Sequence, residues 1–94
     1  MTKAELTKEV SLKTGLEPET VMEVFQQSLI TIKSAVASGE ACYFRGFGTF
    51  IPKKRAKKIG QNITKGEMVV VPEHNIAFFK PGKDFNKAMK KLAV

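Results

Sequence analysis

Residues 45–72 read RGFGTFIPKKRAKKIGQNITKGEMVVVP, and this stretch decides the fold. Its first six residues and the later run Glu67–Val71 have the aromatic and β-branched composition of strands. Between them, residues 60–66 are rich in the residue types that form turns. The pattern predicts a long β-hairpin arm over about residues 52–72. Its two end prolines mark the arm's base or its strand edges, because proline donates no ladder hydrogen bond.

This arm also carries nearly all of the net charge of the chain. The whole sequence has 16 Lys and Arg against nine Asp and Glu, a formal charge of +7. Residues 53–65 contain no acid and hold Lys53, Lys54, Arg55, Lys57, Lys58 and Lys65. The remainder is close to balance, so the arm is a local cationic field that attracts polyanions. Ten extended residues reach about 33 Å, near one turn of DNA, so the arm suits DNA.

Residues 1–40 are predicted to form two helices. Thr2, with a glutamate three residues later, is a capping-box signature, and Gly15 is placed to end the first helix. Pro18 suits the first position of the second helix and Gly39 its end. That helix carries one apolar stripe at steps of three or four residues: Val21, Phe25, Leu29, Ile32 and Val36. Neither helix begins with the Arg, Asn and Gln residues that a major-groove reader needs.

From residue 41 the residue composition becomes typical of strands. Residues 41–51 contain a Gly-Phe-Gly turn between two aromatic segments, which predicts a tight hairpin. The run Asn75–Phe79 predicts a third strand, and the apolar spacing after Gly82 predicts a last helix. We therefore expect one domain of residues 1–94 with an α+β fold. Its parts are two N-terminal helices over 1–40, a three-stranded antiparallel sheet drawn out into the β-hairpin arm over 41–79, and a short C-terminal helix over 80–94.

A second chain is expected to complete the core. A 94-residue domain buries only a modest fraction of its surface, and a protruding arm adds little to any core. The sequence nevertheless has seven phenylalanines, whose exposure would create large apolar patches. The residues expected in this dimer core are Phe25, Leu29, Ile32, Phe44, Phe47, Phe50 and Phe79.

The sequence has few of the residues that catalytic and metal sites require. His74 is the only histidine, and with Glu73 it supplies two ligands, which make a poor metal site. The single Cys42 lies in an apolar strand, where a packed thiol is expected, and it permits no internal disulfide. We expect no enzyme, cofactor, metal or small-molecule substrate. No apolar run approaches membrane-spanning length and no signal peptide is indicated, so a cytoplasmic protein without membrane contact is expected.

The chain also contains a series of short motifs at characteristic spacing. They are Gly46-Phe47-Gly48-Thr49-Phe50, the pair Arg55-Ala56, a Gly-x-Asn tip at Gly60 and Asn62, and a Phe-x-x-Gly-Lys ending at Lys83. Over essentially the whole chain this series resembles the HU and integration host factor (IHF) family of bacterial DNA-bending proteins. The resemblance implies an intertwined homodimer, or a heterodimer, whose two β-arms wrap DNA through the minor groove.

The resemblance further implies which residues contact DNA. The arm cations would line the minor groove or its phosphates, Lys3 would lie near the surface that receives DNA, and two lysines beside the last helix would clamp the backbone. The expected set is Lys3, Arg45, Gly46, Thr49, Lys53, Lys54, Arg55, Lys57, Lys58, Gln61, Asn62, Ile63, Lys65, Lys80 and Lys83.

The tip of the arm departs from the family pattern. The family usually has Gly-Arg-Asn-Pro there, with its proline wedged between base pairs, whereas this chain has Gln61 and Ile63 in the second and fourth positions. Isoleucine is apolar and large enough to act as a wedge, although it lacks the rigid ring. We therefore expect Ile63 to be the DNA wedge of this chain.

The function expected from these observations is non-enzymatic binding and bending of double-stranded DNA with low sequence specificity, within the bacterial nucleoid. Bent, nicked or junction DNA should be favoured because part of its bending cost has already been met. One alternative is a site-specific bending factor of the IHF type. A second is an RNA-binding protein, although the arm lacks the exposed aromatic residues that stack on RNA bases. A third is a purely structural protein of an assembly, whose basic arm binds an acidic partner.

Overall fold

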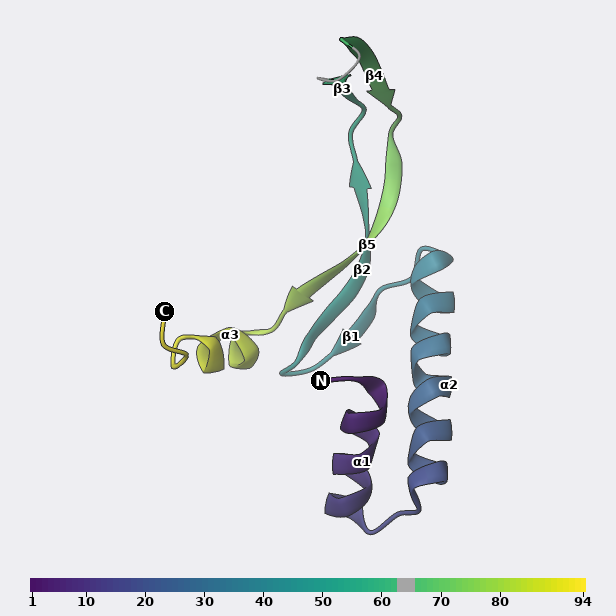
Figure 1. Ribbon diagram of the computed structural model, residues 1–94, viewed down its shortest axis with the longest axis vertical. Helices are drawn as coiled ribbons and strands as arrows, with labels where there is room; N and C mark the ends of the chain where they lie inside the picture. Colours follow the sequence, from purple (N-terminus) through teal and green to yellow (C-terminus); the bar gives the residue numbers. More distant parts are fainter. Residues whose placement is uncertain (63–65) are drawn as a thin grey trace. The chain divides into compact units, whose positions relative to one another are not determined.

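The computed structural model describes residues 1–62 and 66–94. Its contacts divide the chain into two compact units, Met1–Ser34 and Ala35–Val94, each of which is described by itself. The first contains the first helix and most of the second, and the second contains the end of that helix, the strands and the last helix (Figure 1). Among the helices of the described ranges, none combines the length and apolar character needed to cross a membrane.

The first helix, α1 (Lys3–Thr14), begins and ends as its sequence predicts. The hydroxyl of Thr2 accepts a hydrogen bond from the Glu5 N–H at 3.1 Å, which confirms the N-cap. That hydroxyl also donates to the Glu5 carboxylate at 3.2 Å, so the two side chains of the capping box bond to each other. At the other end Gly15 is left-handed, with φ of 75°, and its N–H donates to the Ser11 carbonyl.

The second helix, α2 (Pro18–Ala37), begins at the proline that marks its first position. It ends in a double hydrogen bond: the Gly39 N–H donates to the Val36 carbonyl and the Glu40 N–H to the Ala35 carbonyl. These bonds confirm Gly39 as the helix stop. Of the predicted apolar stripe only Val21 is buried in this chain, whereas Leu29 stays 42% exposed.

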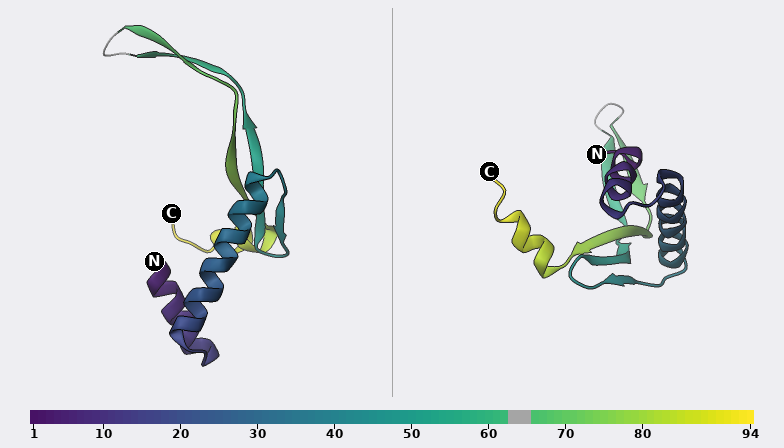
Figure 2. Two further views of the ribbon diagram at one scale, coloured as in Figure 1. Left: turned by 90° about the vertical axis from the view of Figure 1, so that its right-hand side faces the viewer. Right: turned by 90° about the horizontal axis from the view of Figure 1, so that it is seen from below.

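The second unit is built on a three-stranded antiparallel sheet with the order β1–β2–β5. Its strands are β1 (Cys42–Phe44), β2 (Gly48–Arg55) and β5 (His74–Pro81). Between β2 and β5 the chain forms a second antiparallel pair, β3 (Lys58–Asn62) and β4 (Glu67–Val71). In Figures 1 and 2 this pair continues the β2–β5 ribbon outward. The predicted sheet and β-hairpin arm are therefore confirmed.

The two prolines expected to mark the arm lie in different settings. Pro52 lies inside β2 opposite Ala77, whereas Pro72 directly follows β4. The pairing of β1 with β2 stops at Phe50, so at Pro52 the central strand has only β5 beside it. A strand tolerates proline on such an open side, where no ladder partner needs its N–H. Pro52 therefore lies at an open strand edge, as predicted, just beyond the point where the three-stranded sheet narrows to the two-stranded β2–β5 ribbon.

The last helix, α3 (Lys83–Met89), is shorter than the predicted span of 80–94. At its start, Lys80 and Pro81 still pair with β2, so they belong to β5. At its end, the N–H groups of Lys91 and Leu92 donate three residues back rather than four. This tighter turn ends the α-helical ladder, and the C-terminal residues beyond it lie outside the helix.

The core of the second unit is a cluster of five phenylalanine rings, which comprises Phe44, Phe47, Phe50, Phe79 and Phe85. The closest pair, Phe50 and Phe79, has ring centroids 4.7 Å apart, and tilted and edge contacts join the others. The cluster unites four residues of the expected dimer core and adds Phe85 from α3, which was not expected there. It remains open, because Phe47 is 50% and Phe44 39% exposed in this single chain. Dimerisation itself stays a prediction.

Candidate nucleic-acid interface

Strand alternation sorts the cations of the ribbon onto two faces. Side chains of directly opposed residues share a face, and neighbours along a strand alternate. One face of the β2–β5 pair therefore carries the phenylalanine cluster together with Lys54. The other face, named here the cationic face, carries Thr49, Lys53 and Arg55 of β2 with their partners Lys80, Ile76 and His74 of β5.

The cationic face holds Lys53 in a defined position. Its ammonium lies 4.1 Å from the centre of the Phe78 ring, a cation–π contact between diagonal neighbours on that face. Such a contact contributes about 0.5–1 kcal/mol at exposed sites. Phe78 had no expected role, but the period of two along β5 already places it opposite the face that carries Phe79.

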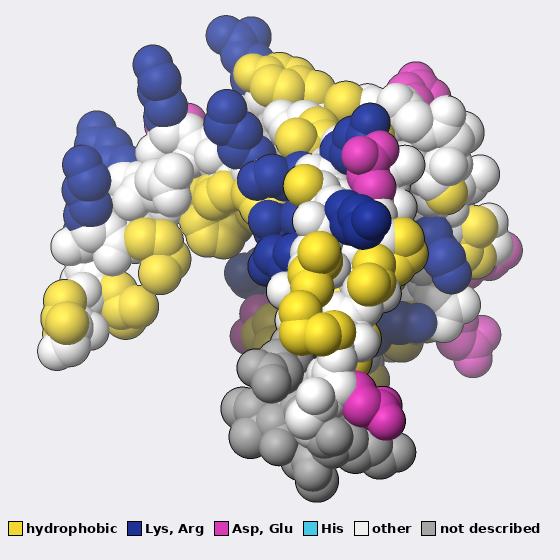
Figure 3. Space-filling model, turned by 90° about the horizontal axis from the view of Figure 1, so that it is seen from above, with side chains coloured by type: hydrophobic (Ala, Val, Ile, Leu, Met, Phe, Trp, Pro, Cys, Tyr) yellow, Lys and Arg dark blue, Asp and Glu magenta, His cyan; other side chains and the backbone are white. Residues whose placement is uncertain are grey.

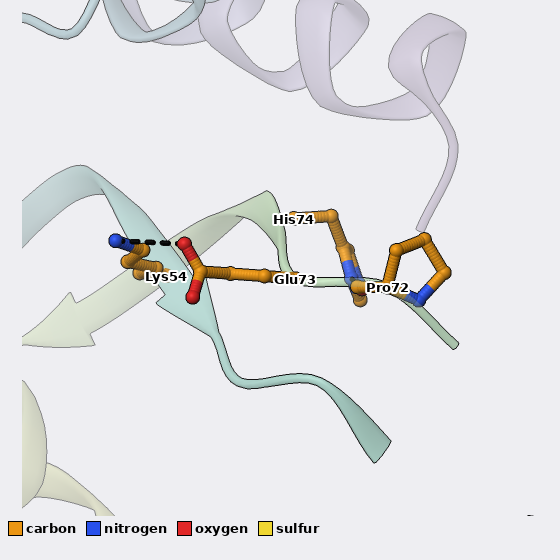
Figure 4. Close-up of polar contacts among 4 residues, drawn as sticks. All are labelled: Lys54, Pro72, Glu73 and His74. Atoms are coloured by element: carbon orange, nitrogen blue, oxygen red, sulfur yellow. Dashed lines mark hydrogen bonds and ion pairs between the residues drawn. The ribbon is translucent and has the colours of Figure 1, made fainter. Parts of the chain in front are cut away.

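Lys54 lies on the opposite face and has an ionic partner within the chain. Its ammonium is 2.8 Å from the Glu73 carboxylate (Figure 4). Both side chains are more than half exposed, so the pair contributes only about 0–1 kcal/mol of stability. It nevertheless places an acid against one of the predicted DNA-binding cations. Lys54 therefore differs from Lys53 in both orientation and local charge.

His74 lies at the exposed end of β5, opposite Arg55. Its Nδ1 is 2.9 Å from the Pro72 carbonyl oxygen, so the imidazole ring contacts the backbone two residues earlier in the chain (Figure 4). Because Glu73 pairs with Lys54, the two residues weighed as metal ligands have separate partners. In residues 1–62 and 66–94, no group of three or more His, Cys, Asp or Glu could hold a metal ion.

The turn from Phe44 to Gly48 packs against the start of α3. The Gly82 N–H donates to the Phe47 carbonyl at 2.8 Å, and a Cβ on Gly82 would lie 3.3 Å from the turn backbone. Gly48 is tighter still, because a Cβ there would lie 2.5 Å from the Phe79 ring and 2.7 Å from the Lys80 carbonyl oxygen. The Gly-Phe-Gly motif thus allows backbone to approach backbone where side chains would collide.

This packing leaves an open concavity of about 550 Å³ beside the sheet. Four predicted DNA-contacting residues line it, namely Gly46, Thr49, Lys80 and Lys83. Asp84 is the one acid among its lining residues, and its carboxylate lies 3.4 Å from where a Cβ on Gly46 would be. Residues from β2, β5 and α3, distant in sequence, therefore meet at one surface with an excess of positive charge.

The outer arm combines cations with exposed apolar side chains. Arg55, Lys57 and Lys58 are all exposed. On the β3–β4 pair, Ile59, Met68 and Val70 share one face and are between 53% and 66% exposed. Figure 3 shows dark blue Lys and Arg side chains over the arm with yellow apolar side chains among them. The apolar run Met68–Val71 could have indicated exposed apolar side chains on the arm, which the expected site omitted.

The remaining predicted site residues are distributed elsewhere. Lys3 is the first residue of α1, in the first unit, and Arg45 is exposed in the turn between β1 and β2. Gln61 and Asn62 belong to β3. The expected wedge Ile63 and the arm cation Lys65 lie outside the described residues.

Known proteins resemble this chain over nearly its full length. The family model described as bacterial DNA-binding protein matches residues 1–90. The chain is 36% identical to DNA-binding protein HU of Thermotoga maritima over 90 residues, which cover 96% of this chain and 100% of the relative. It is 32% identical to integration host factor subunit beta of Paraburkholderia phymatum over 97 residues, with 99% and 88% covered. Among solved structures, an Anabaena HU–DNA cocrystal structure has a TM-score of 0.92 at 29% identity, with 98% and 100% covered.

Proposed function

The chain belongs to the HU and integration host factor family of bacterial DNA-binding proteins, and on that premise we propose that it binds and bends double-stranded DNA as a histone-like architectural protein. The observation that carries this proposal is the cationic face. Thr49, Lys53, Arg55 and Lys80 lie along one side of the ribbon that leads into the arm. An aligned row of donors and cations suits the regular phosphate backbone, and no reaction is part of the proposal.

Affinity in this proposal comes from phosphate neutralisation. Cations that replace condensed counterions on DNA favour binding without reading sequence. The exposed lysines of the arm, among them Lys57 and Lys58, contact phosphates or follow the minor groove. Discrimination then depends on how easily the DNA deforms, so bent, nicked and junction DNA bind better than straight duplex.

A homodimer supplies two such arms. The open phenylalanine cluster of the second unit and the exposed Leu29 of α2 support this part of the proposal, because a partner chain would remove their apolar surface from water. Residues 1–40 then form a helical dimerisation part, 41–81 the sheet with its DNA-binding arm, and 82–94 the C-terminal segment. The proposed localisation of the protein is the nucleoid in the bacterial cytoplasm.

A mobility-shift panel tests the function. It compares linear, nicked and four-way-junction DNA of equal length with duplex RNA, each at two salt concentrations. We expect all three DNAs to bind, with the nicked and junction forms tightest and RNA weakest. A single duplex sequence bound about a thousandfold better than random duplex would instead indicate a site-specific factor of the IHF type. Tightest binding to RNA would refute the proposal.

The bend is assigned to Ile63, whose wedge role rests on its sequence position at the arm tip. Ile63→Ala should leave affinity for straight duplex nearly unchanged, because the phosphate contacts survive. It should reduce the bend, because unstacking a base step costs a few kcal/mol and the wedge that offsets it is gone. Ile63→Pro, which restores the family's usual residue, should keep or increase the bend. Fluorescence transfer between the ends of a short labelled duplex measures bending, and an Ile63→Ala variant that bends DNA like the wild type would contradict the assignment.

A further inference from the structure

Tyr43 extends the cationic face across the whole sheet. It lies on β1 directly opposite Thr49, and Thr49 lies directly opposite Lys80 on β5. The three side chains therefore form one transverse row over three strands, on the face away from the phenylalanine cluster. The next residue, Phe44, points the other way, as its edge contact with the Phe50 ring shows. Alternation on β1 thus separates one aromatic residue for the core from one for the cationic face.

Packing within this chain does not explain why a tyrosine occupies position 43. Its side chain is 75% exposed, the most exposed aromatic residue among the described large apolar ones. It lines the 550 Å³ concavity together with Thr49, Lys80 and Lys83. A tyrosine combines an apolar ring with a hydroxyl donor, and in DNA-binding proteins such hydroxyls are among the groups that contact phosphate oxygens. Asp84 lines the same concavity, and the two lysines outnumber it.

We propose that Tyr43 is a further DNA contact, whose hydroxyl donates a hydrogen bond to a backbone phosphate oxygen beside the one that Lys80 neutralises. The inference rests on the proposed function and assigns a residue that neither the charge pattern nor the family motifs indicate. Adjacent strands are about 4.8 Å apart, so the row from Tyr43 to Lys80 spans about 10 Å. Tyr43, Thr49 and Lys80 at that spacing can bind a DNA backbone that runs across the strands. Because tyrosine is neutral, its hydrogen bond orients this backbone without adding charge.

The composition of the chain allows a direct test. Tyr43 is the only tyrosine and the chain has no tryptophan, so tyrosine fluorescence reports on this side chain alone. Acrylamide should quench the fluorescence of the free protein efficiently, because the side chain is exposed. Saturation with a short duplex should reduce that quenching severalfold. Unchanged quenching in a complex that a mobility shift shows to have formed would overturn the proposal. Strong protection already in the free protein would also overturn it, because a second chain would then cover the residue.

Variants separate the hydroxyl from the ring. Tyr43→Phe keeps the ring and removes one hydrogen bond to a charged acceptor in each chain, so it should weaken DNA binding by the dimer about a hundredfold. The slope of affinity against salt should stay unchanged, because the residue carries no charge. Thr31→Val, which removes an exposed hydroxyl from α2, is the matched control and should bind like the wild type. Wild-type affinity in Tyr43→Phe would overturn this contact alone, whereas a wild-type protein that binds no DNA would overturn the proposed function as well.

Discussion

DNA affinity is expected to fall about 10³–10⁵-fold when the salt concentration rises from about 50 to about 200 mM. The physical reason is counterion release: each phosphate that a lysine or arginine neutralises frees condensed cations, and added salt reverses that gain. Two arms, together with the lysines near Lys80, suggest roughly six to ten phosphate contacts per dimer. Because the +7 charge of each chain is concentrated on the arm, counterion release should contribute more to DNA affinity than any other interaction.

The measurement is the slope of log affinity against log salt, taken with two neighbouring variants. Lys53→Ala should lower the slope by about two per dimer, because Lys53 lies on the cationic face in each chain. Lys54→Ala should change it much less, because Lys54 lies on the opposite face and already pairs with Glu73. The variants differ by one position and remove the same charge, so each controls for the other. Equal slopes for both, or an affinity insensitive to salt, would contradict this use of the two faces.

The local features of the fold were predictable because their causes are local. Thr2 caps a helix through its own hydroxyl, and Gly15 ends that helix through its own backbone freedom, so a few adjacent residues carry the information. Pro18 starts α2 for the same kind of reason. The arm was predictable because strand-forming segments flank turn residues within one continuous stretch.

Features that depend on register were not predictable in the same way. Pro52 lies within β2 because β2 still pairs with β5 after its pairing with β1 has ended at Phe50. The short α3 depends on Lys80 and Pro81 pairing with residues more than thirty positions earlier. Phe85 joins the aromatic cluster only because the Gly-Phe-Gly turn packs against the start of α3. These are tertiary effects, and a sequence pattern contains them only implicitly.

The candidate site shows the same division. Charge density alone indicated Lys53 and Lys54 together, and strand pairing places them on opposite faces. It likewise brings Thr49 beside Lys80 and adds Tyr43 to that row. Composition therefore identifies the kind of ligand, whereas register decides which side chains of a dense cationic segment meet it.

Replacing Phe47 by alanine is expected to cost about 3–5 kcal/mol of folding stability, the usual range for a phenylalanine removed from a well-packed core. The size of the loss is itself informative. In the single chain Phe47 is 50% exposed, although its ring centroid lies 5.4 Å from that of Phe79 and 5.3 Å from that of Phe85. A half-exposed ring contributes only part of the free energy of full burial. A loss of the full size therefore requires a second chain that covers the ring.

Met89 provides the matched control, because it is 49% exposed and lies at the end of α3. Met89→Ala should cost no more than about 1 kcal/mol, as exposed positions usually do. Urea unfolding at several protein concentrations measures both variants, and the wild-type midpoint should rise with concentration because folding and association are linked. Light scattering at micromolar concentration should give the mass of two chains. Two results together would contradict the dimer: Phe47→Ala costs no more than Met89→Ala, and light scattering gives the wild type the mass of one chain. The open phenylalanine cluster would then be a surface of the monomer, and a single chain could not bind DNA with two arms.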